Sequence, residues 1–112
     1  MNDTLSNARE RSHNAVRTLV VHCGSVQERL YLSYVELLGI ESNKLGDNPM
    51  RYQLEGIMKD CIEGKRAANQ ADDAKAVIYS ISDVKAAEIA ERILKLFLDI
   101  DRELLIQNIP RI

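Results

Sequence analysis

Few side chains in this chain of 112 residues are of the types that bind soft metal ions or act as nucleophiles. The histidines and cysteines are His13, His22, Cys23 and Cys61, and no two of them have the Cys-x2-Cys or His-x3-His spacing of zinc sites. A serine or cysteine nucleophile needs a base that only the fold can bring to it. The five glycines form neither a phosphate-binding loop nor a dinucleotide fingerprint. We therefore expect no metal, no cofactor and no catalytic residue.

Arg17 and His22 form the one spacing that suggests nucleic-acid chemistry, Arg-x4-His. It resembles the motif of the HEPN family of helical ribonucleases, whose members are small helical bundles that dimerise. The resemblance implies that His22 would serve in acid-base chemistry on RNA and that Arg17 would hold phosphate at the dimer interface. It covers six residues, and on a helix the two side chains lie about 140° apart. The alternative is a surface arginine and a histidine at the edge of the core.

Two pairs of acidic residues stand at helical spacing, Asp60 with Glu63 and Glu88 with Glu91. They resemble the paired acids of the helical, magnesium-dependent nucleotide pyrophosphohydrolases of the MazG family. The resemblance implies that carboxylates from two helices would hold magnesium while nucleotide phosphates complete its shell. The second pair departs from that family because Glu91 is not an aspartate. Glu88 and Glu91 also project away from the main apolar side of their predicted helix, which is typical of solvated charges.

Charge and hydropathy argue against nucleic-acid binding and against membrane insertion. With 15 basic and 17 acidic residues the net charge is −2, and there is no basic stripe that would bind nucleic acid. No apolar run approaches the roughly 20 residues that span a bilayer, and residues 2–4 lack a signal pattern, so we expect no membrane contact and a cytoplasmic protein. Cys23 and Cys61 fall on the apolar sides of their predicted helices, which indicates reduced core thiols; a bridge between them would require an oxidising compartment.

The spacing of apolar residues predicts an all-α fold, an elongated antiparallel bundle of three to four helices in a single domain covering residues 1–112. An apolar stripe about 100° wide runs from Leu5 to Leu37. Ser25 with Glu28 matches a capping box and offers a second helix start beside Gly24. The stripe keeps its angle on both sides of Gly24, however, so we favour one long helix over residues 4–39, at most bent there.

Later helix starts are marked by caps. Asn48 followed by Pro49 predicts the start of a helix, and a break or bend is expected between Gly64 and Asp73. Residues 72–81 are expected to form a short helix or a redirected continuation of the preceding one. Residues Ser80 to Asp83 offer several caps for a last helix that ends near Ile106.

The last helix is apolar on two sides that together cover about 200°, twice what one-sided packing needs. A first helix about 54 Å long would also be longer than the diameter of a compact monomer, about 34 Å. We therefore expect a homodimer, or else a different protein partner, while the alternative is a compact monomer with a bent first helix. The predicted interface residues are Tyr31, Val35, Leu38, Leu94, Leu98 and Leu105. The function that we predict is a non-enzymatic interaction module, a class that includes small bacterial adaptors, inhibitors, immunity proteins and secretion chaperones.

Overall fold

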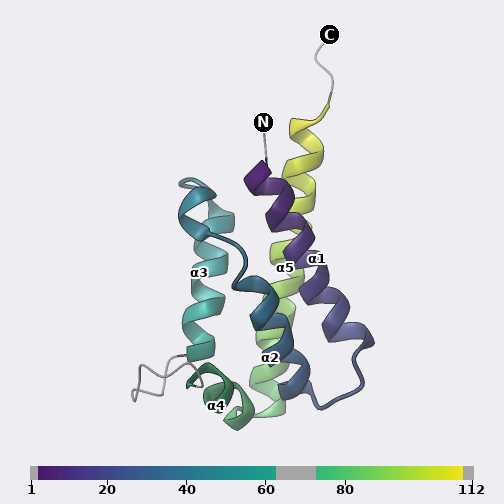
Figure 1. Cartoon of the computed structure of the whole chain (residues 1–112), viewed down its shortest axis with the longest axis vertical. Coiled ribbons are helices and arrows are strands. Elements are labelled where there is room, and N and C mark those ends of the chain that lie inside the picture. The colour runs from purple at the N-terminus through teal and green to yellow at the C-terminus, as the bar shows by residue number, and fades with distance from the viewer. Residues whose placement is uncertain (1–2, 63–72, 110–112) are drawn as a thin grey trace.

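Helices joined by short turns form the chain over residues 3–62 and 73–109, which are the residues that the computed structural model describes. They are α1 (Asp3–Val21), α2 (Val26–Leu37), the 3-10 helix η1 (Ser42–Lys44), α3 (Pro49–Ile62), α4 (Asp73–Ser80) and α5 (Asp83–Gln107). The molecule measures 52 × 29 × 19 Å, and α5 follows its longest axis (Figure 1). This arrangement confirms the all-helical class.

The predicted helix over residues 4–39 is two helices, and this expectation was wrong. α1 ends at Val21, and α2 starts after Ser25, whose hydroxyl accepts a hydrogen bond from the Glu28 amide at 3.0 Å. Arg29 closes the turn from the other side, because its guanidinium donates to the carbonyl oxygens of Leu19 at 2.8 Å and Gly24 at 3.1 Å. Free amides at one helix end and free carbonyls at the other thus both have partners.

The constant angle of the apolar stripe misled because it records only which residues face the core. α1 and α2 fold back against each other, and each has its own apolar side facing the core (Figure 1). The apolar residues of the two helices happen to share one helical angle, so their spacing does not show the break between them. The described residues accordingly hold five α-helices, more than the three to four expected. Because the first helix is divided, its length is no longer an argument for a dimer.

Small side chains line the buried side of α1. Ala8, Ser12 and Ala15 recur every three or four residues along α1 and are fully buried. The buried hydroxyl of Ser33 in α2 donates to the carbonyl oxygen of Ala15 at 2.8 Å. This hydrogen bond gives the buried Ser33 side chain the partner that a polar group in a core needs.

The core forms around one side of α5, which packs against α1, α2 and α3. We call this side the inner stripe; its residues are Ala86, Ile89, Ile93, Leu96 and Ile100, all fully buried. The largest buried side chains that meet it come from α2, α3 and α4: Leu30, Leu37, Leu54, Ile57 and Ile78. Burial of such side chains contributes about 1.5–3 kcal/mol each.

The other predicted helix starts are confirmed. The Asn48 side chain accepts a hydrogen bond from the Arg51 amide at 3.0 Å, and α3 begins at Pro49. Ser82 caps α5 by accepting from the Lys85 amide at 3.0 Å. The break expected between Gly64 and Asp73 lies almost wholly outside the described residues. None of the helices in the described ranges is long and apolar enough to cross a membrane.

The cap at Ser25 gives a test of the divided first helix. Replacing Ser25 with alanine removes the acceptor for the Glu28 amide, and we expect the free energy of unfolding in urea to fall by about 1 kcal/mol. The control is Ser6→Ala at an exposed position of α1, which should change it by less than about 0.5 kcal/mol. An unbroken helix would reverse the sign at Ser25, since alanine is the better residue inside a helix.

Candidate functional site

Arg17 and His22 are not brought together as a ribonuclease site by any contact in the described structure. Arg17 is an exposed residue of α1, and His22 lies in the turn that follows. The imidazole Nε2 of His22 lies 3.1 Å from the Glu28 carboxylate, in the first turn of α2. His22 thus supports the α1–α2 turn.

The described residues of the two acid pairs have different surroundings. Asp60 of α3 forms an ion pair with Arg92 of α5 and so joins the two helices, while Glu63 lies outside the described residues. Glu88 and Glu91 are exposed on α5. Across residues 3–62 and 73–109, no group of three or more histidine, cysteine or acidic side chains gathers as a metal site would require.

The cysteines differ from each other, and one expectation fails. Cys61 is buried in α3 as predicted, whereas Cys23 is exposed because it lies in the α1–α2 turn and not on a helix face. Both are free thiols, so the structure does not contain the alternative bridge. Burial, with the neighbouring Asp60 charge adding to it, raises the pKa of the Cys61 thiol to about 12.

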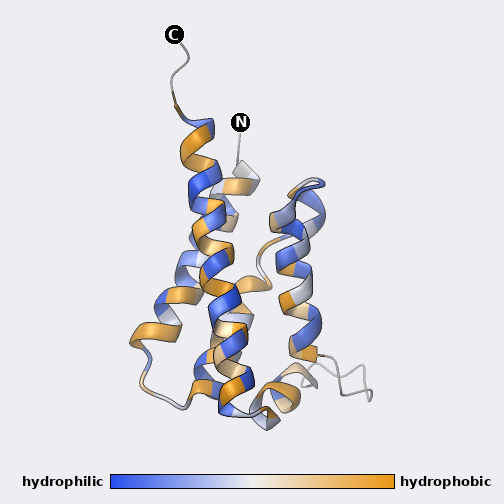
Figure 2. Cartoon of the chain, turned by 180° about the vertical axis from the view of Figure 1, so that it is seen from behind, coloured by the Kyte–Doolittle hydropathy of each residue, from blue (hydrophilic) through white to orange (hydrophobic). Residues whose placement is uncertain are grey.

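The second apolar side of α5 is exposed along the helix, as the spacing predicted. We call it the outer stripe; its residues are Val84, Ala87, Leu94, Leu98 and Leu105. The exposed fractions of Leu94, Leu98 and Leu105 are 42%, 49% and 67%. Figure 2 shows α5 in front of the other helices, with apolar and polar residues alternating along it. Charged residues border the stripe in an open, shallow depression that includes Glu88, Lys95 and Arg102.

Ion pairs on both flanks of α5 set which side faces outward. On one flank, Arg9 of α1 donates to Asp101 at 2.6 Å, and its guanidinium lies over the Phe97 ring. On the other flank, Gln53 of α3 donates to Asp99 at 2.9 Å, and Asp60 pairs with Arg92. The exposed outer stripe lies between these two rows of contacts.

The predicted interface residues of α2 lie on a different face of the molecule from those of α5. Val35 of α2 and Leu38, the residue that follows this helix, are exposed. α2 lies in front of α5 in Figure 1 and behind it in Figure 2. Leu38 lines an apolar groove of about 340 Å³ between the end of α2 and α3, together with Met58 and Ile62. The structure therefore contains two apolar faces, whereas the sequence predicted a single one.

Tyr31 belongs to neither exposed face. Its ring packs against the core and against Tyr34 and Tyr79, with ring centroids 6.4 Å and 6.1 Å away. The Lys75 ammonium lies 5.7 Å from the centroids of both the Tyr31 and Tyr79 rings. Tyr31 therefore holds α4 against α2.

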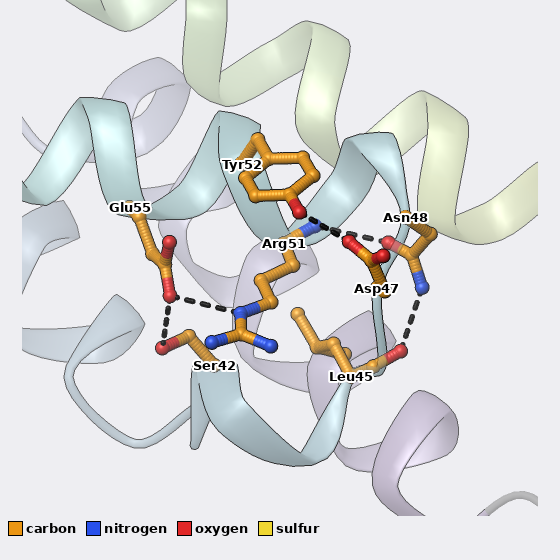
Figure 3. A network of polar contacts seen from close by, with 7 residues as sticks. All are labelled: Ser42, Leu45, Asp47, Asn48, Arg51, Tyr52 and Glu55. Atoms are coloured by element: carbon orange, nitrogen blue, oxygen red, sulfur yellow. Dashed lines mark hydrogen bonds and ion pairs between the residues drawn. The ribbon is translucent and has the colours of Figure 1, made fainter.

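A polar network at the start of α3 was not anticipated beyond its cap (Figure 3). Asn48 also donates to the Leu45 carbonyl oxygen at 2.6 Å, and Tyr52 donates to Asp47. Glu55 accepts from Arg51 at 3.1 Å and from the Ser42 hydroxyl at 3.2 Å. These side chains satisfy one another and fix η1 against α3. The sequence signal was the Arg51–Glu55 pair at i,i+4 spacing.

Beside this network lies a cleft of about 650 Å³ between the starts of α1 and α3 and the second half of α5. Leu5, Leu45 and Met50 supply apolar lining, and charged side chains of both signs, among them Lys44 and Glu103, line it as well. The mixture favours no single class of ligand.

Comparisons of the chain with protein-family models, with curated proteins and with solved structures found no match.

The two thiols should differ in reactivity. At pH 8 a pKa of about 12 leaves about one Cys61 side chain in ten thousand as the reactive thiolate, and burial blocks access to it. We expect an aromatic disulfide reagent to modify Cys23 in the folded protein and Cys61 only after denaturation. The Cys23→Ser variant should release almost no chromophore until denaturant is added. Rapid reaction of that folded variant would contradict the burial of Cys61.

Proposed function

We propose that this protein is a non-enzymatic interaction module, and that the outer stripe of α5 binds another protein chain, a second copy of itself. The observation that carries the proposal is the exposure of Leu94, Leu98 and Leu105 on one side of α5. Single exposed apolar residues are ordinary on protein surfaces, but rows of them with charged borders are typical of protein interfaces.

The continuity of the row supports this proposal. α5 has 25 residues, and exposed apolar side chains of the outer stripe recur from Val84, near its first turn, to Leu105, near its last. The end of α5 also extends past the start of α3 in Figure 1. Ile106 and Ile109, near this end of the chain, add to the exposed apolar surface. Covering this surface would contribute free energy in proportion to the apolar area removed from water.

The α2–α3 groove gives the module a second candidate face. Its apolar lining and the exposed Leu38 beside it suit an amphipathic segment of a different protein. A dimer that pairs through α5 would leave this groove open, since α2 lies on the opposite side of α5 (Figures 1 and 2). We propose that such a dimer acts as an adaptor, inhibitor or chaperone in the cytoplasm, where both free thiols would stay reduced.

A matched pair of substitutions tests which face self-associates. Leu98→Asp places a charge in the outer stripe, and we expect the dimer measured by sedimentation velocity to dissociate while the far-ultraviolet circular dichroism stays unchanged. Leu38→Asp is the control, because Leu38 is similarly exposed but lies beside the α2–α3 groove. It should leave the dimer intact.

A Leu98→Asp variant that keeps the wild-type sedimentation coefficient would contradict the proposal for α5. Dissociation caused by Leu38→Asp alone would assign self-association to the α2–α3 groove.

A further inference from the structure

We infer that two copies of α5 pair antiparallel along their outer stripes, so that Leu94 of one subunit packs against Leu98 of the partner subunit. This inference rests on the proposed function and specifies the geometry of the same face. Three observations carry it: the spacing of the stripe, the register of its leucines and the charges on its border.

The spacing is that of a helix that pairs with another helix. Alternating steps of three and four residues connect positions 84, 87, 91, 94, 98, 101 and 105 of α5, the period that lets two helices keep a common seam. Five of these positions are apolar and make up the outer stripe. The inner stripe is buried within the chain, whereas the residues of the outer stripe are exposed.

One antiparallel register sets four of the five outer-stripe positions opposite one another. When Leu94 faces Leu98 of the partner subunit, a two-fold axis near residue 96 relates the helices, and Ala87 then faces Leu105 of the partner subunit. The paired region extends over about 27 Å of helix. A shift by one heptad in either direction removes the Leu94–Leu98 contact and sets leucines opposite Glu91 or Asp101.

The border charges are complementary in the same register. Glu88 and Arg102 lie seven residues before and after Lys95 on the same edge of the seam, and neither forms an ion pair within the described part of the chain. The antiparallel arrangement brings Glu88 beside Arg102 of the partner subunit, and it does so twice because of the symmetry. In a parallel pair the charged edge of one helix would instead lie beside the opposite edge of its partner. That edge consists of residues that carry no charge, Ala90, Phe97 and Leu104.

The acids that interrupt the seam also have a partner. Glu91 would lie opposite Asp101 of the partner subunit, a like-charge pair if considered alone. Arg9, however, holds Asp101 at 2.6 Å and is nearly half exposed, so its guanidinium can bind both carboxylates. Lys95, close to the two-fold axis, pairs with Asp99 at 2.8 Å, which reduces the repulsion between the two lysines.

Charge reversal tests the register, with the dimer dissociation constant measured by sedimentation equilibrium. Glu88→Arg and Arg102→Glu should each raise the constant at least about tenfold, because each turns two attractive contacts into two repulsive ones. The double variant Glu88→Arg/Arg102→Glu should restore it to within about threefold of the wild type. Lys85→Glu changes the net charge as much as Arg102→Glu does, at an exposed position outside the seam, and should have little effect.

The experiments distinguish an incorrect register from an incorrect interface. A wild-type dimer that Leu98→Asp dissociates, but that the double reversal fails to restore, would overturn the antiparallel register and leave the α5 interface in place. A wild-type chain that is monomeric at every concentration would overturn both.

Discussion

The structure depends on one constraint: α5 is apolar on two sides, and the other helices of the described ranges bury only one of them. The inner stripe provides the surface on which α1, α2 and α3 pack. The helices that meet it lie on that side and on the flanks of α5. A wide apolar helix surface is stable in water only when neighbours cover it. The outer stripe is the part of α5 that lacks such cover among the described helices.

Polar contacts on the flanks of α5 fix which of its two apolar sides faces outward. Arg9 holds Asp101 from α1, and Arg92 and Asp99 bind side chains of α3. A rotation of α5 that buried the outer stripe would break these contacts and expose the inner isoleucines. Exposed ion pairs contribute little stability individually, but these fix the angle of the helix relative to its neighbours. The chain thereby presents the same apolar row as a defined surface.

Much of this arrangement could be predicted from the sequence, because local chemistry determines it. Asn48 with Pro49 and Ser82 marked helix starts by the hydrogen bonds that their side chains make with the following amides. The two stripes of α5 followed from helical periodicity alone. Leu94, Leu98 and Leu105 were correctly predicted to be apolar residues outside the main stripe.

The remaining features depend on tertiary contacts that periodicity does not encode. Ser25 caps α2, and Arg29 closes the turn by donating to the carbonyl oxygen of Leu19. The apolar residues keep the same helical angle on both sides of this turn, so their spacing alone could not reveal it. Tyr31 is held by the ring of Tyr79, 48 residues later in the chain. The separation of Leu38 from the leucines of α5 likewise arises only when α2 folds onto the far side of that helix.

Light scattering during size-exclusion chromatography of the unmodified chain, over a wide range of loading concentrations, tests the central claim most directly. An outer stripe covered by a second copy predicts a mass of twice 12.7 kDa that falls toward 12.7 kDa only on dilution. A mass of 12.7 kDa at every concentration would contradict it, because the stripe would then be exposed to water in the isolated protein.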